Sequence, residues 1–266
     1  MKEGFIILGQ KLAFKQLFTA EDIAEPLASV TIGETEKVEK YFEVRNFDFI
    51  GFKENEQVIG FLEKGKTENI INLQDSVTKF NVSDLITNNT NLLDCLRLLK
   101  KNKHLFVINK SQIESIITLS DIQKPAVRML FFGVVTFFES KIATLIDEIY
   151  PNDEWKPLLK SERINMAMAT YQELVERNQE INLINCTQLC DKTAILLQNK
   201  DVLNKVINMS KTKAGSFFHS INKLRNDLAH AQSLTSWFEE KDVISLVDNL
   251  IIITEVIVDR KGNNRN

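Results

Sequence analysis

The hydrophobic and polar positions of the first 120 residues predict one series of elements that occurs twice. Each copy reads as a strand, an amphipathic helix and two further strands, with a polar turn, ENEQ or NKSQ, between the last two strands. Neither copy is long enough to build a core alone, so we expect the two to pack together as one module. The predicted strands are 28–32, 47–53, 57–63, 82–86, 104–109 and 112–119, and the predicted helices are 35–44 and 91–100.

After Pro125 the pattern changes to apolar spacings of three and four residues, which predict helices. The segment 126–149 is apolar on most faces, so its own bundle, the other module or a second subunit has to cover it. The segment 242–259 is rich in Ile and Val but exceeds the length of a normal strand, and we predict it as a helix. The predicted helices are 126–149, 161–178, 187–198, 201–209, 212–232 and 239–258.

These elements predict an α+β chain in which an N-terminal β/α module precedes an all-α helical bundle. We expect the module at 1–124, the bundle at 125–260 and a flexible tail at 261–266. The composition agrees with a globular protein, because 44% of the residues are hydrophobic and 26% are charged. Only nine glycines and four prolines argue against an all-β fold with many tight turns.

Charge is distributed unevenly along the chain. The net charge is −3, but residues 200–225 carry +5, so the remainder carries −8. A basic stretch in an acidic protein can bind phosphate groups locally. Lys211, Lys213 and Lys223 are therefore candidate RNA-binding residues. The alternative is a solvated helix face that is rich in lysine.

Several features predict a cytoplasmic protein that does not enter a membrane. The most apolar run, MLFFGVVTFF at 129–138, stops at Glu139, short of the roughly 20 residues that span a bilayer. The N-terminus does not fit a secretory signal. Cys95, Cys186 and Cys190 match neither a disulfide framework nor a zinc site, so we expect reduced, packed thiols and no bound metal.

The second copy contains the more specific motif, SIITLSD, in which a strand leads into Thr118 and Asp121 follows three residues later. The order of elements and this motif resemble a tandem pair of CBS domains, regulatory modules that bind adenine nucleotides between two repeats. The resemblance implies that Thr118, Ser120 and Asp121 bind an adenine nucleotide (ATP, ADP or AMP). The hydroxyl and nearby amides would hold phosphate at a helix N-terminus, and the carboxylate would accept hydrogen bonds from ribose.

Two observations limit this interpretation. Ser120 or Asp121 could simply be the N-cap of the following helix. In the first copy Glu63 and Lys66 stand where the threonine and the aspartate would be. We therefore expect one nucleotide site at most.

The helical half contains the sequence RNDLAH at 225–230. In the predicted helix 212–232, Asn226 and His230 lie one turn apart on one face, and the long side chain of Arg225 can reach the same space. Leu224, Leu228 and Ala231 are predicted to attach the opposite face to the bundle. A neutral imidazole can move the proton of a ribose 2′-hydroxyl or of the leaving 5′-oxygen, and a guanidinium can stabilise charge on phosphate.

This hexad in an all-α domain is similar to the Arg-x4-6-His motif of HEPN domains. The resemblance implies a metal-independent endoribonuclease, with Arg225, Asn226 and His230 as catalytic residues in a composite site that two copies form across a homodimer. Cleavage would need no cofactor, and the N-terminal nucleotide would regulate it by favouring one arrangement of the two copies. A role as a toxin or in antiviral defence follows by analogy with the family.

Other interpretations remain open at this stage. The chain could be a non-catalytic, nucleotide-sensing dimer that recruits a protein partner, or the helical domain could serve an antitoxin or a nucleotidyltransferase partner. His230 could be a surface histidine at the end of a helix. Arg225 and Asp227 could form an exposed ion-pair face. His219, eleven residues before His230, is predicted to pack near Phe217.

Overall fold

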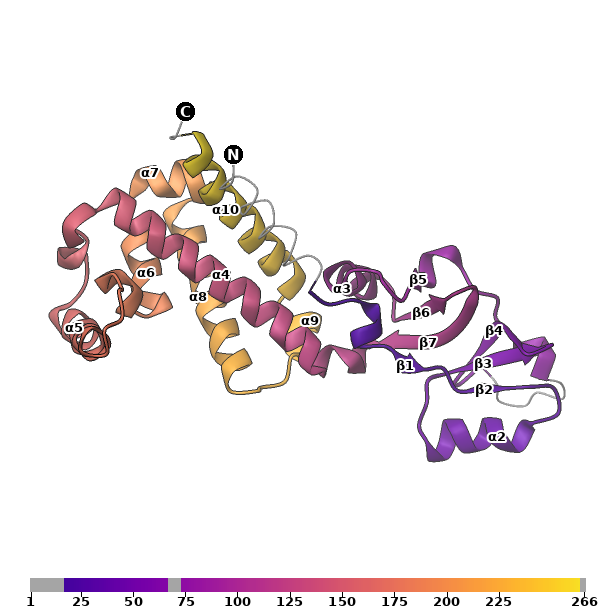
Figure 1. Cartoon of the computed structure of the whole chain (residues 1–266). Helices are drawn as coiled ribbons and strands as arrows, with labels where there is room; N and C mark the ends of the chain where they lie inside the picture. Colours follow the sequence, from indigo (N-terminus) through magenta and orange to yellow (C-terminus); the bar gives the residue numbers. More distant parts are fainter. Residues whose placement is uncertain (1–16, 67–72, 264–266) are drawn as a thin grey trace. The chain divides into compact units, whose positions relative to one another are not determined.

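The computed structural model describes residues 17–66 and 73–263. The chain divides into two compact units, and the division falls between Val127 and Arg128 (Figure 1). Residues 1–16 of the predicted first module lie outside the described residues. The predicted tail at 261–266 is shorter than expected, because the last helix continues to Asn263, and residues 264–266 also lie outside the described residues.

The strand–helix–strand–strand order is confirmed in both copies of the N-terminal unit. In each copy the first strand runs parallel to the second, and the second runs antiparallel to the third. The first copy consists of β2 (Ser29–Val30), α2 (Thr35–Glu39) with a π-helical continuation (Lys40–Val44), β3 (Phe49–Glu54) and β4 (Gln57–Glu63). The second consists of β5 (Leu85–Thr87), α3 (Leu92–Lys101), β6 (His104–Asn109) and β7 (Gln112–Thr118).

A short strand that the sequence pattern did not predict joins the two copies. Strand β1 (Glu25–Pro26) precedes the first copy but pairs antiparallel with β7 of the second, so that Glu25 lies opposite Ile116. The sheets are therefore β2-β3-β4 and β1-β7-β6-β5. Because a segment next to one copy completes the sheet of the other, neither copy is an independent folding unit.

The core between these sheets draws on both copies, as the length of each copy predicted. Phe61 of β4 packs with Phe106 of β6, with ring centroids 4.8 Å apart, and Leu27 and Ile116 complete the buried cluster. A second cluster lies between the first sheet and α2, where Val38 and Phe42 are among the buried residues. Burial of this apolar surface is the main stabilising contribution to the unit.

From Pro125 to Asn263 every described element is helical, which confirms the α+β prediction. Most helix boundaries differ from the sequence prediction by a few residues. The largest differences are that the helix predicted to end at 232 ends at Ala229, and that the last helix begins at Val243, after a separate short helix, and continues to Asn263. The helices are α4 (Pro125–Ile149), α5 (Ser161–Glu176), α6 (Leu189–Leu196), α7 (Lys200–Val202) with a π-helical continuation (Leu203–Ile207), α8 (Lys211–Ala229), α9 (Thr235–Glu239) and α10 (Val243–Asn263).

Helix α4 corrects one expectation from the sequence. The apolar run 129–138 is shorter than a bilayer span, but the helix that contains it, α4, has 25 residues and an 18-residue window with a mean hydropathy of 1.7. By length and composition alone it is the one helix of the described part that could cross a membrane. Half of that window is buried, and Phe131 and Phe138 are fully enclosed. In this structure one face of α4 contributes to the core of the bundle, whereas Met129 and Phe132 are exposed, so the described residues do not cover α4 on all sides as its composition predicted.

Candidate functional site

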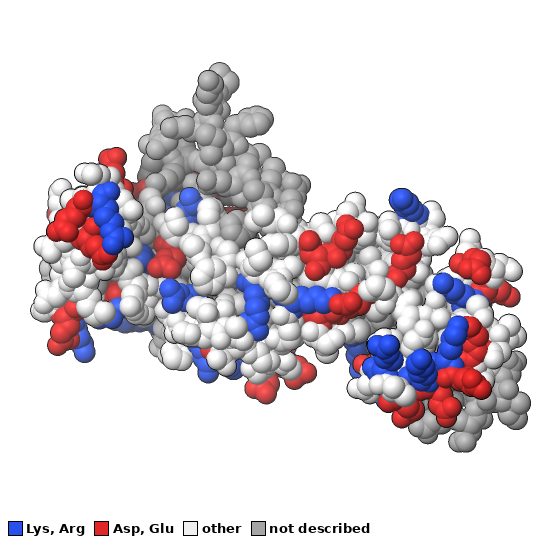
Figure 2. Space-filling model, turned by 60° about the horizontal axis from the view of Figure 1, so that its bottom comes forward, with Lys and Arg blue, Asp and Glu red and all other residues white. Residues whose placement is uncertain are grey.

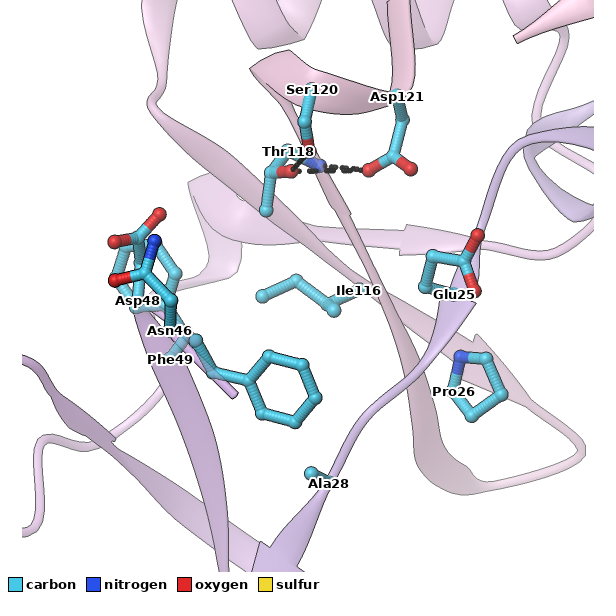
Figure 3. Close-up of a pocket in the computed structure, with 11 residues that line it drawn as sticks. Glu25, Pro26, Ala28, Asn46, Asp48, Phe49, Ile116, Thr118, Ser120 and Asp121 are labelled. Carbon is cyan, nitrogen blue, oxygen red and sulfur yellow. Dashed lines mark hydrogen bonds between the residues drawn. The ribbon is translucent and has the colours of Figure 1, made fainter. Parts of the chain in front are cut away.

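A cavity of about 300 Å³ lies in the N-terminal unit, between segments that belong to both copies. The three predicted nucleotide residues, Thr118, Ser120 and Asp121, all line it (Figure 3). In Figure 3, Asn46 and Asp48 lie on one side of the cavity and Glu25 and Pro26 on the other. The complete lining is Glu25, Pro26, Ala28, Asn46, Phe47, Asp48, Phe49, Ile116, Thr118, Ser120 and Asp121.

Asp121 is buried, and its carboxylate is occupied by its own chain. Oδ2 accepts hydrogen bonds from the backbone N–H of Thr118 at 2.7 Å and from the Thr118 hydroxyl at 3.2 Å. This reciprocal arrangement is a capping box in which Thr118 is the N-cap. The alternative that Ser120 or Asp121 is the N-cap is therefore wrong. Asp121 is the third residue of the helical turn that Thr118 caps.

The segment after β7 also differs from the predicted phosphate site. A 3₁₀ helix (Leu119–Gln123) follows Thr118, and α4 begins only at Pro125. The Thr118 N–H, which was expected to hold phosphate, already donates to Asp121. Lys124 Nζ donates to the Ile23 carbonyl at 2.7 Å, lies 3.0 Å from Asp121 Oδ1 and pairs with Glu25. Lys124 thus fastens the segment before β1 to the segment after β7.

Sequence reasoning missed the wall that the first copy contributes. Asn46, Phe47 and Asp48 lie between the π-helical turn and β3, and Phe49 opens β3. Asn46 has a left-handed backbone (φ 54°), and its side-chain oxygen accepts a hydrogen bond from Lys64 Nζ at 2.9 Å. Asparagine tolerates this conformation, so the turn chemistry was visible in the sequence. The sequence did not show that this turn and β7 of the other copy line the same cavity.

The first copy has no equivalent of the Thr118–Asp121 arrangement. Glu63 and Lys66 occupy the matching positions, and they form an ion pair of 2.5 Å with each other. This pair replaces the hydroxyl and carboxylate of the second copy. The expectation of one nucleotide site at most agrees with this difference.

The Arg-Asn-His sequence lies at the C-terminal end of α8, with one difference from the prediction. His230 is the C-cap residue, and Ala231 has a left-handed backbone (φ 52°) and is exposed. The expectation that Ala231 packs against the bundle is therefore wrong, whereas Leu224 and Leu228 are buried as predicted. The N–H groups of Ala231 and Gln232 donate to the carbonyls of Leu228 and Asp227, which is a Schellman termination.

Two side-chain contacts hold the turn that follows α8. Asp227 Oδ2 accepts a hydrogen bond of 2.9 Å from the indole N–H of buried Trp237 on α9, so Asp227 is not part of an exposed ion-pair face. Arg128 Nη2 on α4 donates to the carbonyl of Gln232 at 2.6 Å. The backbone around His230 is consequently fixed from two sides.

The three candidate catalytic side chains are exposed at this end of α8. Arg225 Nη1 lies 3.4 Å from Asn226 Oδ1, so the arginine reaches toward the asparagine as its length predicted. Asn226 and His230 share one helix face by their spacing, and Lys223 and His219 precede them on the same face. His219 is exposed, so the prediction that it packs near Phe217 is wrong.

The candidate RNA-binding lysines do not form a single cluster. Lys211, Lys213 and Lys223 are all exposed, but Lys211 and Lys213 belong to the first turn of α8. Lys213 and Lys223 are roughly 15 Å apart along the helix axis, at 1.5 Å per residue. On the face drawn in Figure 2, Lys and Arg side chains are interspersed with Asp and Glu. Lys223 is the lysine of this set nearest in sequence to the Arg-Asn-His residues.

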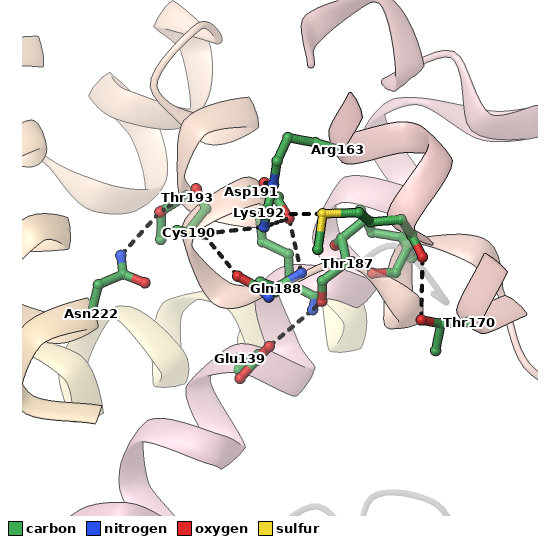
Figure 4. A network of polar contacts seen from close by, with 12 residues as sticks. Glu139, Arg163, Thr170, Thr187, Gln188, Cys190, Asp191, Lys192, Thr193 and Asn222 are labelled. Atoms are coloured by element: carbon green, nitrogen blue, oxygen red, sulfur yellow. Dashed lines mark hydrogen bonds and ion pairs between the residues drawn. The ribbon is translucent and has the colours of Figure 1, made fainter. Parts of the chain in front are cut away.

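A polar network inside the helical unit connects α8 with the helices around it (Figure 4). Lys192 of α6 is buried and donates to Glu139 of α4 at 2.9 Å and to the carbonyl of Thr187 at 2.5 Å. Asn222 of α8 donates to Thr193 Oγ1 of α6 at 3.4 Å. Lys192 and Thr193 are buried, whereas Cys190 at the edge of the network is exposed. These contacts position α6 against α4 and against α8, the helix that carries Arg225.

Arg163 of α5 belongs to the same network. Its Nε and Nη2 donate to the two carboxylate oxygens of Asp191, each at 2.7 Å, a two-point contact that orients both side chains. Hydrogen bonding to Asp191 raises the pKa of Arg163 above its usual value.

The cysteines are packed to different degrees. Cys95 is buried, and this burial raises the pKa of its thiol to about 12, so it stays protonated at neutral pH. Cys190 is exposed, which corrects the expectation that all three thiols are packed. Within the described residues, no three His, Cys, Asp or Glu side chains gather in a way that could hold a metal ion.

Neither a protein-family model nor a curated protein matches the chain. The solved structures that resemble its N-terminal part include CBS-domain proteins. A CBS domain-containing protein of unknown function from Bacillus anthracis is 13% identical, covering 41% of this chain and 91% of its own, with a TM-score of 0.35. CBSX2 in complex with AMP is 16% identical, and the match covers 42% of this chain and 98% of CBSX2, with a TM-score of 0.35.

An uncharacterized conserved protein from Pyrococcus horikoshii is 18% identical, covering 40% of this chain and 90% of its own, with a TM-score of 0.34. Because these TM-scores lie below 0.5, we base the functional proposal on the geometry of this chain.

Proposed function

We propose that the N-terminal unit senses an adenine nucleotide, which binds in the cavity between the two copies. The observation that supports this most is the lining of the cavity. Its volume of about 300 Å³ lies within the range of small-molecule sites, and it combines apolar surface with a few polar groups. Phe49 and Ile116 offer an apolar wall for a base, and Asp48, Thr118 and Ser120 offer hydrogen-bonding groups for a sugar.

The experiment for this proposal is calorimetric titration of the full chain with adenosine, AMP, ADP and ATP. Ile116→Trp fills the cavity from β7 and should abolish binding. Ile113→Trp is the matched control on the same strand, outside the cavity lining. Absence of binding by all four compounds to the wild-type protein would overturn the proposal.

We further propose that the helical unit cleaves RNA without a metal ion, as a homodimer in the cytoplasm. The specific observation that favours this is the exposed position of Arg225, Asn226 and His230 on a rigidly held helix end. In the reaction the ribose 2′-oxygen attacks the phosphorus as His230 of one copy takes its proton. The bond to the 5′-oxygen breaks as a second imidazole donates a proton to that oxygen, and Arg225 stabilises the charge on phosphate.

Two copies would place two such sets around one phosphodiester, and nucleotide binding would regulate cleavage by favouring one arrangement of the copies. A toxin or defence role, restrained by an antitoxin or a nucleotidyltransferase partner, is part of the same proposal. If the chain instead acts as a nucleotide-sensing dimer that recruits a partner, the exposed set serves as a contact surface.

Cleavage of single-stranded RNA in chelator separates these two possibilities. Arg225→Ala and His230→Ala should each lower the rate by about 10²–10³-fold, and the products should carry 2′,3′-cyclic phosphate. His219→Ala is the matched control, since His219 is an exposed histidine on the same helix. If the wild-type protein leaves RNA intact with and without adenine compounds, the ribonuclease proposal fails and the recruiting role gains support.

A further inference from the structure

We infer that the cavity selects adenine compounds by their hydrogen-bond donors and discriminates against phosphate, so that adenosine binds more tightly than ATP. This inference rests on the proposed binding of an adenine compound in the cavity, and it narrows the ligand class to adenine compounds with a free ribose and few or no phosphate groups. It is carried by the hydrogen-bonding groups that line the cavity.

The hydroxyls at the cavity already contact one another and Asp121. The oxygens of Thr118 and Ser120 are 2.7 Å apart, and either hydroxyl can be the donor. The Thr118 hydroxyl also lies 3.2 Å from Asp121 Oδ2, which accepts a hydrogen bond from the Thr118 N–H. Both donors of Thr118 are thus engaged within its own turn. Among the eleven described lining residues, the Asn46 amide offers a neutral N–H group, but none offers the cationic donor that phosphate oxygens favour.

The charges of the lining also disfavour a ligand that carries phosphate. Three carboxylates line the cavity, and none of its eleven described lining residues is Lys or Arg. The carboxylates of Glu25 and Asp121 are bound by Lys124. The Asp48 carboxylate receives no hydrogen bond from the residues that the structure describes, and it belongs to the wall opposite Glu25 (Figure 3). An acceptor with this charge matches ribose hydroxyls and repels each added phosphate.

Asp48 is accordingly the residue that determines this selectivity. It can bind a ligand without rearranging the fold, because the hydrogen bond that involves it within the fold is made by its backbone carbonyl, from the Lys64 N–H at 2.9 Å. Asp121, which the sequence motif singled out for ribose, instead holds the turn after β7. The carboxylate that recognises ribose thus comes from the other copy.

The test is titration of the full chain with adenosine, 2′,3′-dideoxyadenosine and ATP in chelator, for the wild-type protein and Asp48→Asn. Glu36→Gln is the control, because it changes the net charge equally at an exposed position of α2 outside the cavity. Adenosine should bind wild type at least tenfold more tightly than either other compound, since a charged hydrogen bond contributes about that much. Asp48→Asn should weaken the binding of adenosine about tenfold and reduce the difference between the affinities for adenosine and ATP. Glu36→Gln should leave both affinities unchanged.

Tighter binding of ATP than of adenosine by the wild-type protein would overturn the inference and leave the nucleotide proposal standing. Unchanged selectivity in Asp48→Asn would also overturn it. If neither these compounds nor AMP and ADP bind the wild-type protein, the nucleotide proposal fails as well. These results are distinguishable in one set of titrations.

Discussion

The rings of Phe49 and His104 lie 4.1 Å apart between centroids, tilted by 41°. They are matching residues of the two copies, since Phe49 opens β3 and His104 opens β6. Phe49 lines the cavity, whereas His104 is surrounded by aromatic rings. Both imidazole nitrogens are buried and have no hydrogen-bond partner among the described residues. A polar ring therefore occupies a position that the other copy fills with an apolar one.

This burial predicts that the N-terminal unit loses stability in acid. Desolvation lowers the pKa of His104 below its usual value; Lys66 adds to the shift, and Asp84 and Glu63 oppose it. The unfolded chain, with a histidine pKa of about 6.5, therefore takes up the proton first as the pH falls. Stability should decline from about pH 6.5 downward, until the folded pKa is reached. Hydrogen exchange of β6 and β7 measured from pH 7.5 to 5 checks this.

His104→Phe should remove much of that pH dependence and, at pH 7, stabilise the unit by roughly 1 kcal/mol, because it eliminates two unsatisfied nitrogens. His219→Ala, in the other unit, should leave exchange in β6 and β7 unchanged. An unaltered pH profile in His104→Phe would show that the acid sensitivity arises elsewhere.

Asp227 is predicted to stabilise the turn after α8 through Trp237. Asp227→Ala leaves the buried indole N–H without an acceptor, which costs about 1–3 kcal/mol. Asp227→Asn retains an acceptor for the indole N–H, so its free energy of unfolding should fall by less. Urea unfolding followed by tryptophan fluorescence measures both. Equal losses in the two variants would mean that packing, and not the hydrogen bond, explains the effect.

Ala231→Gly should stabilise the helical unit. Ala231 occupies the left-handed position of the Schellman turn, where a Cβ costs about 1–2 kcal/mol, and the greater freedom of glycine in the unfolded chain offsets part of the gain. The net increase in the free energy of unfolding should be about 0.5–1 kcal/mol in urea. Ala231→Val is the opposing control and should destabilise. A lower free energy of unfolding in Ala231→Gly would argue against this turn geometry.

Lys192→Met should destabilise the helical bundle by about 3 kcal/mol, because Glu139 and the Thr187 carbonyl lose their buried donor. The double variant with Glu139→Leu should recover part of this loss, since it removes the uncompensated carboxylate. Thermal and urea unfolding of the two single variants and the double variant give the coupling energy. If the losses in the free energy of unfolding of the two single variants add up to the loss of the double variant, the ion pair contributes nothing beyond the separate contacts of its two residues.

Local patterns in the sequence were sufficient for most elements. Short apolar runs between polar turns identify β3, β4, β6 and β7, and consecutive buried residues show that β3 and β6 are covered on both faces. The three-to-four spacing after Pro125 identifies the helices. Strand β1 escaped detection because two residues, one of them proline, have no periodicity, and only pairing with β7 makes them a strand.

The sequence by itself determined the repeated β/α unit, the helical half and the Thr118–Asp121 motif after the last strand of the second copy. The tertiary structure alone decided that Asp48 joins the cavity, that Asp121 is occupied by its own turn, and that His230 lies beyond the last helical residue. The physical reason is common to all three. Periodicity reports which face of an element is buried, whereas contacts between distant segments and the satisfaction of individual polar groups depend on the assembled fold.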